Sequence, residues 1–185
     1  EIGLQAPDKM TYAEAFEQTI QVDPHKIDSR ELQKLCKQHG WDASLDDRHA
    51  LLDFLFSEVV IKTLNCAKPL IIYDYPECMS ALATLKLSDP IVSERFELFI
   101  AGMEIANGFN ELSDANEQLQ RFEKELATRR SLGLAEAPID KRFLAALEAG
   151  LPECAGVAIG IERLLMVLSE KDDINAVSTF TLGTN

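Results

Sequence analysis

Two glutamates, Glu97 and Glu104, lie in the otherwise apolar segment RFELFIAGMEIANGF, which spans residues 95–109. A two-residue turn at Ala101-Gly102 would pair the two halves of this segment as a β-hairpin, with the glycine supplying a positive φ. Because successive side chains of a strand point to opposite faces, both carboxylates would then share one face of the hairpin. The other face would be entirely apolar and turned toward the core, with Phe96, Leu98, Ile100, Met103 and Ile105.

Two carboxylates on one face of adjacent strands repel each other unless a cation lies between them. Mg²⁺ suits such a position, because it is typically held by one or two carboxylates while substrate phosphates complete its coordination. The alternative is that both glutamates are simply solvated on an open sheet face. The spacing of Glu97 and Glu104 therefore predicts either a magnesium–phosphate site or a hydrated polar surface.

The segment NGFNE, residues 107–111, places further polar groups directly after the hairpin. Strict alternation would turn Asn107 and Glu111 toward the apolar face, where an unsatisfied amide or carboxylate is costly. A β-bulge adds one residue to a strand and moves the following side chains to the other face. We therefore expect a bulge between residues 105 and 108, near Gly108, that brings Asn107, Phe109 and Glu111 to the carboxylate face.

A second segment, GVAIGIERLLMVL at residues 156–168, alternates small and branched side chains before a predicted helix. Gly156, Ala158 and Gly160 would line one face of a strand, and a row of small side chains lets a flat ligand approach the backbone closely. Arg163 at the start of the helix could stack on a base or bind a phosphate. The alternative is tight packing of helix on sheet beside a surface arginine.

The hydrophobic pattern predicts a mixed scaffold for these segments. Residues 1–66 read as mainly helical, with helices at about 12–20, 28–39 and 46–64. Residues 67–185 read as a sheet with helices, and LIIYDY at 70–75, between two prolines, is a further strand. Strand pairs that are adjacent in sequence and surrounded by helices predict one α+β domain with an antiparallel sheet.

The charge balance constrains the partners, since 18 lysines and arginines stand against 31 aspartates and glutamates, a net charge of −13. Such a surface repels phosphate backbones and argues against a broad nucleic-acid footprint, although a basic protein partner remains compatible with it. The four cysteines and three histidines show no metal-ligand spacing. The sequence shows no signal peptide and no apolar run of about 20 residues, so we expect a cytoplasmic protein outside the membrane.

Together, RFELFIAGMEIANGFNEL and GVAIGIERLLMVL resemble the C-terminal part of a class II aminoacyl-tRNA synthetase catalytic domain of the lysine branch. The second segment is similar to motif 3 of that class, which ends in Gly-x-Gly-x-[Asp/Glu]-Arg. The resemblance covers most of residues 70–177 and implies an antiparallel sheet, flanking helices and an adenylation that requires ATP and Mg²⁺. It is strongest with the truncated lysyl-tRNA synthetase paralogues that ligate (R)-β-lysine to elongation factor P.

The resemblance implies a role for each matched residue around ATP and the amino acid. Glu97 and Glu104 match the carboxylates that coordinate Mg²⁺ and ATP. Arg163 matches the motif 3 arginine at the adenine and γ-phosphate, so that Glu104 and Arg163 are the implied catalytic pair. The amino-acid pocket is matched by Asn107, Phe109 and Glu111. In that pocket, Glu111 would hold the side-chain ammonium of a lysine or β-lysine substrate.

The middle of the small-residue strand differs from the lysyl-tRNA synthetases. Gly156 and Gly160 match the strand that lines the pocket, whereas Ala158 stands where those synthetases generally have glycine. The elongation factor P ligases resemble this chain in having alanine there. One methyl group changes substrate discrimination by only about 1–3 kcal/mol, which suits the selection of a β-amino acid.

The resemblance also implies that residues 1–185 are the C-terminal part of a larger catalytic domain. Motifs 1 and 2 of the class, which build the dimer interface and grip the α-phosphate, are not visible. We therefore expect a homodimer in the complete protein and an inactive isolated chain. Elongation factor P rather than tRNA is the implied acceptor. Three alternatives remain open: a lysyl-tRNA synthetase fragment that charges tRNA, a non-catalytic module that binds lysine or a nucleotide, and a structural or interaction module.

Overall fold

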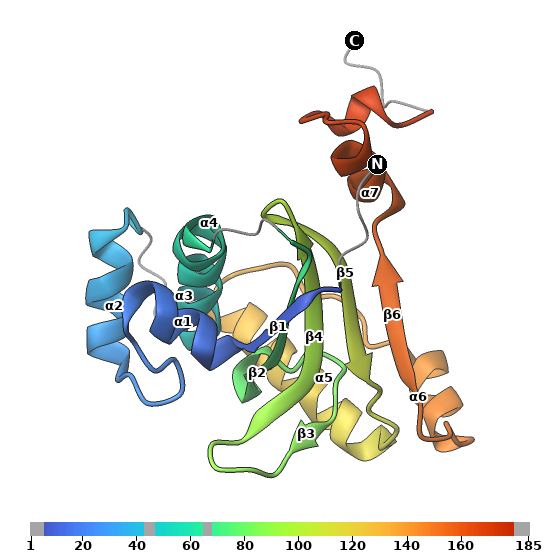
Figure 1. The fold of residues 1–185 in the computed structure, drawn as a ribbon. Helices are drawn as coiled ribbons and strands as arrows, with labels where there is room; N and C mark the ends of the chain where they lie inside the picture. The colour runs from blue at the N-terminus through green and yellow to red at the C-terminus, as the bar shows by residue number, and fades with distance from the viewer. Residues whose placement is uncertain (1–5, 43–46, 65–67, 180–185) are drawn as a thin grey trace.

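A computed structural model describes residues 6–42, 47–64 and 68–179, which form a six-stranded sheet with helices around it (Figure 1). The strands are β1 (Asp8–Thr11), β2 (Leu70–Pro76), β3 (Leu85–Lys86), β4 (Val92–Ile100), β5 (Met103–Asn110) and β6 (Ala155–Ile159). They run in the order β1-β2-β4-β5-β6, and β3 pairs with β4 outside this path. Only β1 and β2 pair in parallel among these strands, so the predicted α+β fold with an antiparallel sheet is confirmed with one parallel pair added.

Helices and single turns of helix connect the strands. They are α1 (Tyr12–Ile20), α2 (Ser29–Gln38), α3 (Arg48–Leu55), the π-helix η1 (Phe56–Val60), α4 (Ile61–Thr63), η2 (Glu77–Met79), α5 (Ala115–Ser131), α6 (Lys141–Glu148), α7 (Ile161–Leu168) and η3 (Ile174–Ala176). The helix expected at 46–64 is thus divided by a π-helical turn, and its first expected residue lies outside the described part. No helix in the described ranges is long and apolar enough to cross a membrane.

Local sequence signals account for several helix ends. Thr11 and Glu14 form a capping box at α1, and Asp28 accepts a hydrogen bond from the Glu31 backbone N–H at α2. Asp114 and Asp140 cap α5 and α6 in the same way. A side-chain oxygen at these positions satisfies backbone N–H groups that have no partner within the helix.

The hairpin of β4 and β5 forms at the predicted turn. Ala101 and Gly102 have φ values of 51° and 76°, and a turn with two positive φ values matches the twist of the flanking strands. Ile100 faces Met103 and Phe99 faces Glu104, as expected. The turn therefore sets the register of the first two pairs.

A β-bulge follows at Ile105, because Leu98 pairs with Ala106 and leaves Ile105 as the extra residue. The bulge was predicted between residues 105 and 108, and it places Asn107 directly opposite Glu97. The bulge lies at Ile105 and not at Gly108, and Gly108 is required because a side chain would not fit at this position. A Cβ on Gly108 would lie 2.8 Å from the Gly156 carbonyl oxygen and would also overlap the Phe96 ring.

The main hydrophobic core lies on the carboxylate face of the hairpin, which corrects the prediction that the opposite face is turned toward the core. Phe99 shares its face with Glu97 and is only 5% exposed, and its ring packs 5.8 Å from that of Phe56. Tyr12 and Phe16 of α1 extend this cluster, whereas Leu98 on the other face is half-buried. Alternation along a strand separates the two faces, but the helices that cover the sheet decide which face is buried.

The opposite end of the sheet is less covered. Figure 1 shows α1 to α4 gathered on one side of the sheet, with α7 projecting beyond the end of β6. Val157 and Ile159 of β6 and Ile161 of α7 are more than half exposed. Of the cysteines, Cys36, Cys78 and Cys154 are free thiols, and Cys66 lies outside the described residues.

Candidate active site

A cavity of about 790 Å³ lies between the β4–β5 hairpin and the helical segments α3 and η1. Four of the predicted site residues line this cavity: Glu97, Glu104, Asn107 and Arg163. The other five predicted residues do not line it. Phe109, Glu111 and Gly156 lie toward the far end of β5, whereas Ala158 lies opposite Asn107 and Gly160 lies beside Ile105.

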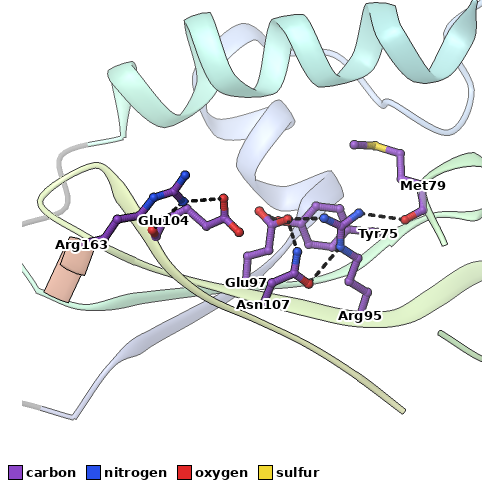
Figure 2. A network of polar contacts seen from close by, with 7 residues as sticks. All are labelled: Tyr75, Met79, Arg95, Glu97, Glu104, Asn107 and Arg163. Carbon is purple, nitrogen blue, oxygen red and sulfur yellow. Dashed lines mark hydrogen bonds and ion pairs between the residues drawn. The ribbon is translucent and has the colours of Figure 1, made fainter. Parts of the chain in front are cut away.

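Glu97 lies at the centre of a buried polar network (Figure 2). The Tyr75 hydroxyl donates to Glu97 Oε2 over 2.7 Å, and Asn107 Nδ2 donates to Oε1 over 3.2 Å. Arg95 Nη2 donates to the same Oε1 in a short ion pair. The negative charge of this buried carboxylate is therefore neutralised within the protein.

The pKa values in this network follow from burial. Burial raises the pKa of Glu97, while the Arg95 guanidinium and the Tyr75 hydroxyl oppose that shift. Burial also raises the pKa of Tyr75 well above its usual value, and the Glu97 charge adds to this effect. The Tyr75 hydroxyl accordingly stays protonated and remains a hydrogen-bond donor at neutral pH.

Arg95 connects this network to its surroundings. Its guanidinium donates to the Met79 carbonyl oxygen over 2.9 Å and to Asn107 Oδ1 over 3.4 Å. It also lies 4.7 Å from the centre of the Tyr75 ring and 5.9 Å from that of Phe109. The sequence reasoning missed both Arg95 and Tyr75. Arg95 was detectable, because it precedes Glu97 by two residues on one strand and so shares its face.

Glu104 and Arg163 form a second, more exposed pair at the turn end of the hairpin (Figure 2). Arg163 Nη1 donates to Glu104 Oε2 over 3.1 Å and to the Glu104 backbone oxygen over 3.0 Å. The Arg163 and Glu104 side chains are 51% and 36% exposed. The structure thus supplies Arg95 for Glu97 and Arg163 for Glu104, so each carboxylate has its own cationic neighbour.

The small-residue face of β6 joins the same side of the sheet. Asn107 pairs with Ala158 and Phe109 with Gly156, so these side chains share a face. A Cβ on Gly156 would lie within 3.0 Å of Glu111 Oε1, so the Glu111 carboxylate occupies the space above this glycine. Gly160, by contrast, leaves ordinary room for a Cβ, and its backbone N–H donates to the Ile105 carbonyl oxygen over 2.8 Å.

The four predicted residues that line the cavity are compatible with a divalent cation shared with phosphate. Within the described ranges, no three histidine, cysteine or acidic side chains gather into a metal-binding cluster. Two carboxylates suffice for Mg²⁺ when substrate phosphates complete the shell. In the described part of the structure, Glu104 Oε1 accepts no hydrogen bond, and Glu97 Oε2 accepts only that of Tyr75. Glu104 is therefore the more available ligand, and Glu97 keeps one acceptor position.

Residues 4–183 match the family described as tRNA synthetases class II (D, K and N). The match spans nearly the whole chain. The chain belongs to this family. Its membership agrees with the six-stranded sheet and with the motif 3 resemblance of β6 and α7.

Several relatives within the family carry one name. The chain is 44% identical over 97% of its length to "Elongation factor P--(R)-beta-lysine ligase" of Mannheimia succiniciproducens. It is 41% and 43% identical to the proteins of the same name from Pasteurella multocida and Vibrio cholerae, over 97% and 94% of its length. The matched region makes up 56%, 56% and 54% of the length of these three relatives, so the chain spans about half of their length.

Proposed function

We propose that the chain is part of an ATP-dependent ligase that activates a lysine-type amino acid, (R)-β-lysine, and attaches it to a lysine of elongation factor P. One observation carries this proposal. A single face of the β4–β5–β6 sheet presents, in order along β5, the Glu104–Arg163 pair, the Glu97–Asn107 pair and the Glu111 carboxylate over Gly156. The relatives named as elongation factor P (R)-β-lysine ligases support the choice of substrate and acceptor.

The order of these groups suits a substrate that is anionic at one end and cationic at the other. Glu111 would bind the side-chain ammonium, because a carboxylate is the natural partner for a cation in a confined pocket. Asn107 would hydrogen-bond the body of the amino acid. The amino acid carboxylate would then point toward Glu104 and Arg163, where ATP phosphates would lie.

Arg163 would serve the nucleotide in this arrangement. An exposed ion pair such as Arg163–Glu104 contributes about 0–1 kcal/mol, so Arg163 can exchange Glu104 for a phosphate at little cost. Glu104, together with the free position on Glu97, would hold Mg²⁺. When bound, this ion would supply positive charge to the phosphates.

The proposed reaction has two transfers. The amino acid carboxylate attacks the α-phosphorus of ATP, the bond to the β-phosphate breaks and pyrophosphate leaves with that electron pair. The lysine ε-amine of elongation factor P then attacks the carbonyl carbon of the adenylate, forming an amide and releasing AMP and one proton. The protein contributes mainly by positioning the reactants and by balancing charge.

Ligand binding to the 185-residue chain tests this proposal. Isothermal titration calorimetry with (R)-β-lysine and L-lysine, each with Mg·ATP, should show tighter binding of (R)-β-lysine. Glu111→Gln should weaken this binding about tenfold or more, because a hydrogen bond to a charged group contributes about 1.5–3 kcal/mol. Glu125→Gln on the exposed side of α5 is the matched control and should bind as wild type.

The outcomes also separate the alternatives. Preference for L-lysine, with aminoacylation of tRNA after reconstitution with the remaining part of a relative, would favour a lysyl-tRNA synthetase fragment. Binding of both ligands without turnover in that reconstituted protein would favour a non-catalytic module. Absence of any binding that depends on Glu111 would contradict the amino-acid site.

A further inference from the structure

We propose that Tyr75 and Arg95 are positioning residues that hold the Glu97 carboxylate and the Asn107 amide in one orientation toward the ligand cavity. Neither residue was expected from the sequence, and in Figure 2 both lie on the side of Glu97 away from Glu104 and Arg163. The inference rests on the proposed function, in which Asn107 contacts the amino acid. It adds that the two groups presented to the ligand are oriented before the ligand arrives.

Tyr75 owes its position to an irregularity in β2. The register of β2 on β4 shifts between Tyr73 and Tyr75, and Asp74 between them has a φ of 55°. β-Bulges commonly re-aim a side chain beside a functional site. Here the Tyr75 ring is fully buried, 4.9 Å from the ring of Tyr12 and 5.7 Å from that of Phe56. The hydroxyl is therefore held at one place, against Glu97 Oε2.

Arg95 holds the other side of the network. Its planar guanidinium donates to Glu97, to Asn107 Oδ1 and to the Met79 backbone oxygen, and it lies over the Tyr75 ring. A guanidinium with three acceptors and a ring beneath it has few alternative orientations. The Arg95 side chain is only 15% exposed, which further limits its freedom.

The amide of Asn107 is oriented as a consequence. Its Nδ2 donates to Glu97 Oε1 and its Oδ1 accepts from Arg95 Nε, so the donor and acceptor ends cannot exchange without loss of both bonds. One N–H and one lone pair of this amide remain for a ligand. The network thus fixes the direction in which the Asn107 amide presents its free N–H and its free oxygen lone pair to the cavity.

Single-hydroxyl substitutions on β2 provide a matched test. Tyr75→Phe removes the donor to Glu97 and keeps the buried ring, whereas Tyr73→Phe removes a hydroxyl two residues away that makes no hydrogen bond in the described structure. (R)-β-Lysine binding to the 185-residue chain with Mg·ATP is measured by calorimetry, and the Asn107 side-chain amide is observed by ¹⁵N–¹H NMR. Circular dichroism verifies that each variant is folded.

Tyr75→Phe is expected to weaken (R)-β-lysine binding about tenfold, the lower end of the range for hydrogen-bond partners of metal-binding side chains. Tyr73→Phe is expected to bind as wild type. The Asn107 amide resonances should shift in Tyr75→Phe and in Arg95→Lys, which keeps the charge but loses the planar fork. Unchanged binding in Tyr75→Phe, or unshifted Asn107 resonances in both variants, would overturn the positioning role.

A double-mutant cycle distinguishes positioning from a general structural effect. If Tyr75 acts through Glu97, then Tyr75→Phe should cause no further loss of binding in a Glu97→Gln background. Additive losses would overturn the inference. If the wild-type chain binds no (R)-β-lysine, the proposed function fails by itself, and the Asn107 resonances still decide whether Tyr75 and Arg95 orient the amide.

Discussion

The Glu111 carboxylate lies against the backbone of Gly156, in the space that a Cβ atom on this glycine would occupy. The overlapping atom is the far end of a flexible side chain, so Gly156→Ala should displace Glu111 rather than unfold the protein. We expect a stability change within about 1 kcal/mol but a marked loss of (R)-β-lysine affinity, measured by calorimetry. Gly160→Ala is the control, because a Cβ there meets its neighbours at 3.6 Å. Equal affinities in the two variants would contradict the role of Gly156.

Charge reversal at Glu104 should separate ligand binding from stability. Glu104→Lys places a cation beside Arg163 and removes the more available of the two glutamates that line the cavity. Binding of Mg·ATP, measured by calorimetry, should be lost, and the same change in the full-length enzyme should abolish adenylation. The melting temperature should change little, since exposed ion pairs contribute about 0–1 kcal/mol. Glu125→Lys on α5 provides the same charge change away from the site, and undiminished Mg·ATP binding by Glu104→Lys would rule out the metal assignment.

Substitutions of two adjacent residues of β4 test which face of the hairpin is buried in the core. Phe99→Ala should lower the free energy of unfolding by about 3–5 kcal/mol, as is typical for a buried aromatic side chain. Leu98→Ala on the half-buried face should cost less than about 2 kcal/mol. Urea denaturation of both variants measures the difference. A larger loss in Leu98→Ala than in Phe99→Ala would restore the prediction that the aliphatic face is the core.

Stability should depend on pH through His25, which lies between α1 and α2. Burial lowers the pKa of His25 below its usual value, and the nearby Arg48 and Lys26 act in the same direction against Asp23 and Asp74. The folded state therefore binds this proton less readily than the unfolded state. Its contribution to stability is complete above a pH of about 6.5 and is lost as the pH falls toward the lowered pKa.

The comparison that isolates His25 uses a His25→Gln variant. Urea denaturation at a pH of about 7.5 and of about 5.5 should show a smaller loss of stability in His25→Gln than in wild type. Parallel losses in the two proteins would show that other groups cause the pH dependence.

Much of the candidate site could be predicted because it depends on interactions between near neighbours in the chain. The turn at Ala101-Gly102 set the first pairs of the hairpin, and the cost of burying Asn107 required a bulge, which the structure places at Ile105. The alternation around Ala158 predicted a row of small side chains on one face of a strand, and the structure places Ala158 opposite Asn107. These features follow from backbone geometry and from the cost of unsatisfied polar groups.

The partners of the glutamates could not be predicted in the same way. Tyr75 reaches Glu97 from a strand 22 residues earlier, and only because β2 contains a register shift. Arg163 reaches Glu104 across 59 residues. A pattern within one segment carries no information about which distant segment will pack against it.

The sequence by itself determined the α+β class, the co-facing Glu97 and Glu104 and the resemblance of two segments to a class II synthetase. The tertiary structure alone decided that Phe99 and Glu97 share the core face, because α1 and η1 bring their aromatic side chains to that side of the sheet. It also decided that Glu97 is buried and partnered while Glu104 is only partly buried. Burial is a property of the assembled helices and sheet, and alternation along one strand cannot specify it.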